Sequence, residues 1–110
     1  MAALTTNVVP LAGLRFDTLL AAANASDDAE TGAGVFLVVK TAGTITTVTI
    51  TTPEVFDGDL ALADRAVVTV ATGETIIPLT SRYRDPATGR CTIGFSPTTA
   101  VTRCVIRTVI

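Results

Sequence analysis

Cys91 and Cys104 are the residues of this chain whose type first suggests chemistry. The chain contains no histidine, so two thiols cannot complete an ordinary structural zinc site, which uses four Cys or His ligands. Their separation also differs from the C-x-x-C spacing of thioredoxin-like redox pairs. If residues 96–99 form the loop of a hairpin, Cys91 lies directly opposite Cys104 in an antiparallel strand pair.

This register predicts a cross-strand cysteine pair with two alternatives for its state. The thiols either pack as two small buried apolar groups or form a disulfide once the protein leaves a reducing compartment. We favour free thiols, because assembly in the cytoplasm would keep Cys91 and Cys104 reduced.

Oxygen-bearing side chains elsewhere do not predict a metal or catalytic site. Asp57, Asp59 and Asp64 lie close together in the sequence, but a calcium loop needs about six oxygens at fixed spacing. We therefore interpret them as solvated turn carboxylates. Ser96 precedes a proline and has no base near it in the sequence, which argues against a nucleophile. The sequence thus predicts no catalytic residue, no metal and no cofactor, and the chain is not expected to be an enzyme.

One charged cluster is predicted in a turn. Asp85 lies between Arg82, Arg84 and Arg90, within the segment "YRDPATGR". The simpler interpretation is surface pairing, which contributes under about 1 kcal/mol. The alternative is a contact between subunits.

Segments rich in Val and Thr predict the elements that must position these residues. The runs at 35–40 and 45–51 predict a hairpin with a Gly-containing connection, and 66–79 predicts a second one with a turn around residues 72–73. The segment 91–108 predicts a closing hairpin. These strands favour an all-β fold: a single-domain antiparallel β-sandwich or small barrel of about six to eight strands.

Other segments are predicted to lie outside the strands. Residues 1–13 are apolar and interrupted by Pro10, which predicts an extended N-terminal arm preceding a single β-domain at 14–110. Residues 24–34 are polar and contain glycine, which is typical of a surface loop.

The composition points to assembly with other protein chains. Hydrophobic residues make up 48% of the sequence, charged residues 16%, and the mean hydropathy is +0.55. A domain of this size buries only about two-thirds of the surface of its unfolded chain. We therefore expect the excess apolar surface to contact other protein subunits.

Charge and hydropathy argue against several other partners. The net charge is −2 without a basic run, and aromatic residues are 5%, so nucleic acid is not an expected partner. Apolar runs such as "VFLVV" are too short to span a membrane. Arg15 and Asp17 lie where the apolar core of an export signal would be, so we expect synthesis and residence in the cytoplasm.

A longer segment carries a family resemblance. Residues 35–79 read "VFLVVKTAGTITTVTITTPEVFDGDLALADRAVVTVATGETIIPL" and are followed by a turn with Tyr83 and Asp85 and by the closing hairpin. This order resembles small virion proteins of tailed bacteriophages, of the capsid (head) decoration or cement type, over residues 30–108. Two features depart from the family pattern: "VVKTAG" stands where an Asn-Gly turn is expected, and cysteines are not part of it.

The resemblance implies a β-sandwich or barrel without enzyme activity. The chain is then expected to bind the major capsid protein on the outer surface of the shell, to stabilise contacts between capsomers and to associate with itself as a trimer or other homo-oligomer. Its expected location is the virion, assembled in the host cytoplasm. One alternative is a phage neck, tail or fibre subunit. Another is an Ig-like adhesion or carbohydrate-binding module, which would need an exposed aromatic platform, although Tyr83 is the only Tyr and Trp is absent.

Overall fold

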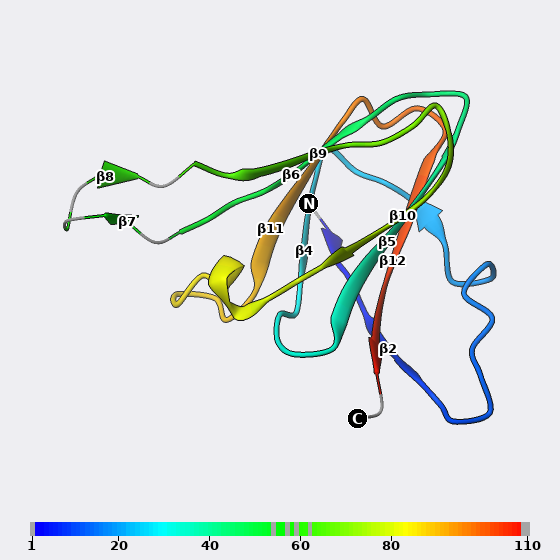
Figure 1. Ribbon diagram of the computed structural model, residues 1–110, viewed down its shortest axis with the longest axis horizontal. Helices are drawn as coiled ribbons and strands as arrows, with labels where there is room; N and C mark the ends of the chain where they lie inside the picture. Colours follow the sequence, from blue (N-terminus) through cyan, green and yellow to red (C-terminus); the bar gives the residue numbers. More distant parts are fainter. Residues whose placement is uncertain (1, 54, 57, 59, 62, 109–110) are drawn as a thin grey trace.

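The computed structural model describes residues 2–53, 55–56, 58, 60–61 and 63–108. Two five-stranded sheets pack face to face, which confirms the prediction of an all-β, single-domain sandwich (Figure 1). The sheets do not close into a barrel, and their ten described strands exceed the six to eight that the sequence predicted.

The first sheet has the order β1 (Ala2–Ala3), β4 (Ser26–Ala29), β11 (Cys91–Ser96), β6 (Thr47–Ile50) and β9 (Arg65–Val68). The second sheet has the order β10 (Thr72–Pro78), β5 (Val35–Ala42), β12 (Val101–Thr108) and β2 (Thr6–Val9), with β3 (Ala21–Ala22) also paired to β12. A separate pair, β7 (Val55–Phe56) and β8 (Leu60–Ala61), extends from β6 and β9, and a 3-10 turn, η1, spans Ser81–Tyr83.

The core lies between the two sheets and follows the period of two that the sequence shows. On β6, Val48 and Ile50 are fully buried while the intervening threonines are half-buried on the outer face, as the pattern predicted. Leu37 and Val39 of β5 meet them from the second sheet as members of the same core cluster. Each fully buried aliphatic side chain of this kind stabilises the fold by about 1.5–3 kcal/mol.

The three predicted hairpins are wrong in their pairing, although their strands exist. The connections β5 to β6, β9 to β10 and β11 to β12 each cross from one sheet to the other, so the two strands of each unit face each other across the core. An alternating pattern fixes which side chains point inward, but both a hairpin and a sheet-crossing arch satisfy it. The hydrogen bond from Thr46 Oγ1 to the Pro97 carbonyl (2.6 Å) shows two of these arches in contact.

One long hairpin is present where the sequence predicted only a turn. β6 pairs antiparallel with β9, and β7 with β8 continues it away from the body of the sandwich (Figure 1). The radius of gyration is 14.0 Å, against about 13 Å for a compact chain of this length, in keeping with such a projection. Asp57 and Asp59 lie outside the described residues.

The segment predicted as an N-terminal arm is part of the sandwich. β1 pairs in parallel with β4 of the first sheet, and β2 pairs in parallel with β12 of the second. The Leu4 amide donates to the Asp28 carbonyl (2.8 Å) and the Asn7 side chain donates to the Val105 carbonyl (3.1 Å). Because these bonds tie it to both sheets, the segment covers two strand edges of its own chain.

The prediction of a surface loop at 24–34 is also wrong in part. Ser26–Ala29 forms β4, which lies between β1 and β11 and buries Asp27 and Ala29 completely. The two adjacent aspartates suggested solvent exposure, but the first of them has a buried cationic partner.

Candidate functional site

Cys91 lies in the core between the sheets. It begins β11, pairs with Ala29 of β4 and is 1% exposed. Burial raises the pKa of its thiol to about 11, with weaker opposing contributions from backbone hydrogen bonds. The thiol is therefore protonated at neutral pH, and since the thiolate is the reactive form, Cys91 behaves as a small apolar side chain.

Cys104 lies on the other side of the second sheet, which corrects the predicted register. It pairs with Val38 of β5, and its neighbours Arg103 and Val105 point toward the first sheet. Because β11 and β12 belong to different sheets, Cys91 and Cys104 do not form an opposed pair, and both are free thiols. Burial also raises the pKa of Cys104.

The predicted charged turn cluster does not assemble around Asp85. The Asp85 carboxylate accepts the Ala87 amide at 2.9 Å and so caps its own turn. Arg90 instead pairs with Asp28 (Nε to Oδ1, 3.4 Å) and donates to the Leu4 carbonyl at 2.9 Å. Arg90 therefore holds the N-terminal segment against β4.

The remaining predicted positions have structural surroundings. The Asp64 carboxylate accepts the Thr52 amide at 2.9 Å, across the long hairpin. Ser96 ends β11 opposite Thr47 and is exposed. Within the described part of the chain, no group of three or more Cys, Asp or Glu is arranged to hold a metal ion.

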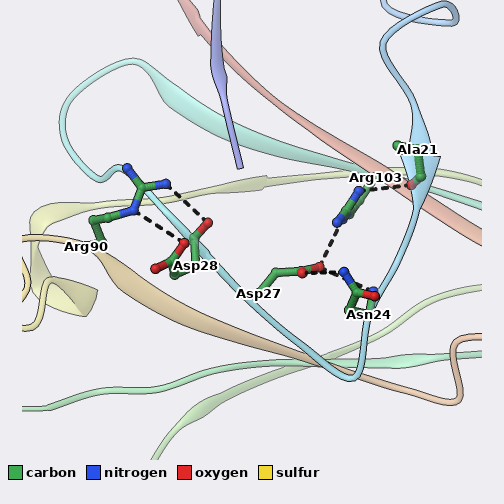
Figure 2. Close-up of polar contacts among 6 residues, drawn as sticks. All are labelled: Ala21, Asn24, Asp27, Asp28, Arg90 and Arg103. Carbon is green, nitrogen blue, oxygen red and sulfur yellow. Dashed lines mark hydrogen bonds and ion pairs between the residues drawn. The ribbon is translucent and has the colours of Figure 1, made fainter. Parts of the chain in front are cut away.

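An ion pair that the sequence did not predict joins the two sheets. Arg103 of β12 donates from Nε to Asp27 Oδ2 of β4 at 2.9 Å, with the side chains 6% and 0% exposed. Figure 2 shows Asn24 completing the arrangement by donating from its side-chain amide to Asp27 Oδ1 (3.1 Å), and Arg103 donating to the Ala21 carbonyl (3.2 Å). Asp27 and Asp28 thus bind arginines on opposite faces of β4.

The electrostatics of this pair favour the charged state of Asp27. Burial alone would raise the pKa of the Asp27 carboxyl, but the hydrogen bonds from Arg103 and Asn24 and the charge of Arg103 outweigh it and lower the pKa. In the sequence, the one sign of this buried ion pair is that Arg103 lies between two valines at inward-facing positions of the same strand.

Two strand edges, on the side of the sandwich opposite the N-terminal segment, have no strand partner among the described residues. β9 is the last strand of the first sheet and β10 is the last strand of the second. The Leu79 amide bonds to the Val35 carbonyl, and backbone hydrogen bonds alternate along an antiparallel pair. The amide and carbonyl groups of Thr72, Glu74 and Ile76 therefore point away from β5.

The same alternation applies to β9. The Thr69 amide bonds to the Thr46 carbonyl, so the backbone groups of Ala66 and Val68 point away from β6. Val68 is 67% exposed and Ile76 is 62% exposed. Proteins commonly protect sheet edges with lysine, proline or a covering segment. Here Pro78 ends β10 and Arg65 begins β9, while the edges between them carry the exposed aliphatic side chains Val68 and Ile76.

A concave region, here called the edge groove, lies between these strands. One cavity of about 480 Å³ is lined by apolar and cationic residues, and an adjoining cavity of about 390 Å³ has a more polar lining that includes Asp64. Both cavities share Arg65, Arg82 and Tyr83. Arg65 Nε donates to the Tyr83 hydroxyl at 3.3 Å, which leaves the phenolic hydrogen available to another acceptor. The apolar lining consists of Val67, Ile76, Ile77 and Pro78.

Apolar surface continues from the groove onto the outer face of the second sheet. The strand register places Ile76, Val38 and Cys104 in one row and Pro78, Phe36 and Ile106 in the next. Val38 and Cys104 are buried, whereas Ile76 and Pro78 are exposed and Phe36 and Ile106 are half-buried, so the apolar surface that continues from the edge of β10 is formed by these last four residues.

No protein-family model, curated protein or solved structure matches this chain. None of the described residues belongs to a helix of the length and apolarity required to cross a membrane. The fold and the surface define the chain as a two-sheet β-sandwich whose N-terminal segment covers one side while the strand edges of the other side stay open.

Proposed function

We propose that this chain is a non-enzymatic structural protein of a tailed-phage virion, which binds the outer surface of the capsid and stabilises contacts between capsomers. The observation that supports the proposal most strongly is the uncovered apolar edge formed by β9 and β10, with Val68 and Ile76 mostly exposed. Such an edge is suited to binding another protein chain, and the order of features along residues 30–108 resembles the decoration-protein family.

The size of the molecule is compatible with more than one contact. Its accessible surface is 6305 Å², so a standard interface of about 800 Å² per partner would cover about an eighth of it. The proposed partners are the major capsid protein and further copies of this chain, as a trimer or other homo-oligomer. Each contact then stabilises the shell by burying apolar surface, and the effect is repeated at every equivalent site.

The interior suits a subunit that transmits force without rearranging. Asp27 and Arg103 connect the two sheets through a buried, hydrogen-bonded ion pair, and Cys91 and Cys104 are buried thiols with raised pKa values. These groups support a static scaffold. Neither thiol is placed for redox or nucleophilic chemistry.

The proposed function can be tested by measuring whether the purified protein binds to capsids that lack it. We expect the protein to sediment with these capsids in a saturable manner and to raise the temperature at which they release their genome. Sedimentation with isolated tails or necks and not with capsids would favour the neck, tail or fibre alternative. Binding to a glycan array, with no binding to capsids, would favour an adhesion module.

A further inference from the structure

We infer that the edge groove is the partner-binding site and that it accepts an extended peptide segment carrying an apolar side chain next to a carboxylate. The inference deepens the proposed function, since it identifies the part of the sandwich that contacts the partner and the chemistry of that contact. It is carried by three features that coincide in one place: cationic donors, an apolar lining and free backbone groups.

The cationic donors lie where the two cavities of the groove meet. Arg65 and Arg82 line both of its cavities, and within the described residues neither forms an ion pair. Asp64 lines only the smaller, polar cavity, where it accepts the Thr52 amide, and the lining of the larger cavity includes Arg65 and Arg82 but no carboxylate. The Arg65 guanidinium beside the Tyr83 hydroxyl, together with Arg82 in the lining of the same cavities, provides donors that complement a carboxylate.

The apolar lining follows directly from these donors toward β10. Val67 faces the groove from β9, and Ile77 and Pro78 face it from β10. A ligand consisting of a free anion alone would leave this lining in contact with water. A segment with an aliphatic residue beside an acidic one would occupy both parts, because the cavities share Arg65 and Arg82.

The free backbone groups favour an extended segment over a helix. The outward amide and carbonyl groups of Glu74 and Ile76 on β10 can pair with an added strand, as in β-augmentation. From Ala66 to Ser81 the only charged residue is Glu74, so this edge lacks the lysines that usually prevent strand addition. Charge complementarity with Arg65 and Arg82 therefore favours a segment with an acidic residue, and main-chain pairing with β10 orients that segment.

The fluorescence of Tyr83 provides a test of peptide binding in the edge groove. Tyr83 is the only tyrosine and tryptophan is absent, so intrinsic fluorescence reports on the groove alone. The probes are the synthetic peptides acetyl-Val-Ile-Glu-Val-amide and, as the matched control, acetyl-Val-Ile-Gln-Val-amide, with sodium acetate as a free carboxylate. We expect the Glu peptide to change the fluorescence of Tyr83 saturably and to bind about tenfold more tightly than the Gln peptide, which corresponds to about 1.4 kcal/mol.

Two arginine variants test whether the preference for the Glu peptide arises in the edge groove. Arg82→Gln should weaken the preference for Glu over Gln, since Arg65 alone remains, whereas Arg84→Gln should keep it, because Arg84 lines neither cavity. Both arginines are exposed, and circular dichroism would verify that each variant folds. A Glu peptide with N-methylated backbone amides should bind more weakly than the unmethylated one if strand pairing contributes.

Several results would overturn the inference. Equal binding of the Glu and Gln peptides, or equal losses in Arg82→Gln and Arg84→Gln, would exclude carboxylate recognition at this place. Acetate binding as tightly as the Glu peptide would exclude a peptide ligand. A last outcome separates the inference from the proposed function. If no probe binds, but the wild-type protein and Arg82→Gln sediment equally well with capsids, the edge groove is not the site of contact. The proposed function would then still stand.

Discussion

Replacing Asp27 by Asn should destabilise the protein far more than replacing its neighbour Asp28. Asp27 is fully buried against Arg103, so Asp27→Asn leaves a cation inside the sandwich without its counter-charge. Removing one partner of a buried ion pair costs about 3–5 kcal/mol. The new amide oxygen can still accept from Arg103 Nε, and the Ala21 carbonyl stays bound, so we expect the lower end of that range.

The matched control is Asp28→Asn on the same strand. The Asp28 and Arg90 side chains are 25% and 27% exposed, and their ion pair is longer, at 3.4 Å, with no hydrogen bond between the paired atoms. Water reaches the rest of both side chains, so the loss of this pair should cost less than the loss of the Asp27 pair, on the order of 1 kcal/mol. Unfolding in guanidinium chloride followed by circular dichroism measures both values. A loss of about 3 kcal/mol is a large part of the roughly 5–15 kcal/mol that holds a small domain folded.

The pH dependence of the free energy of unfolding should reflect the same ion pair. Because the folded-state pKa of Asp27 is lowered, its contribution is fully present above the pKa of an unfolded Asp, about 3.9, and is lost as the pH falls through the lower folded value. The stability difference between wild type and Asp27→Asn should therefore shrink in strong acid.

A double replacement keeps the prediction testable if Asp27→Asn fails to fold. Asp27→Leu with Arg103→Met removes both charges together and should recover most of the stability. Equal stabilities for Asp27→Asn and Asp28→Asn at neutral pH would refute the assignment of the buried pair.

Three further outcomes follow from the fold. Cys91 and Cys104 should resist a thiol reagent in the native protein and react in denaturant, since burial raises both pKa values; an unreduced mass two hydrogens below that of the dithiol would contradict this. Deleting residues 2–9 should lower the denaturant midpoint, because it removes a strand from each sheet; an unchanged midpoint with impaired incorporation into particles would indicate an external arm. Val68→Lys and Ile76→Lys should leave stability within about 0.5 kcal/mol of wild type and reduce self-association measured by light scattering, because both side chains are mostly exposed; unchanged association would show that these edges are not the contact.

The positions of β5, β6 and β9 to β12 were predictable from the sequence, whereas their partners were not, and β2 and β4 lie in segments predicted as an arm and a loop. The alternation around Val48 and Ile50 identified both the element and its buried face. The same alternation is satisfied when successive strands enter opposite sheets, as β11 and β12 do. The predicted cysteine pair was wrong because it assumed that β11 and β12 form a hairpin, whereas their connection crosses from one sheet to the other.

The polar features were the least predictable part. Asp27 and Arg103 are 76 positions apart, and each looks like a solvent-exposed residue until its partner is known. The edge groove is formed by Arg65 from one sheet, Ile77 from the other and Tyr83 from the turn after β10, so no local pattern marks it. The excess of apolar residues did predict an exposed apolar surface, but composition carries no information on its position.

The copy number of this protein in purified virions tests the proposed function most directly. A decoration protein occupies sites that the shell repeats by symmetry, so quantitative mass spectrometry should find on the order of hundreds of copies per particle, in a fixed ratio to the major capsid protein. A dozen copies or fewer per particle, or none, would contradict binding over the capsid surface.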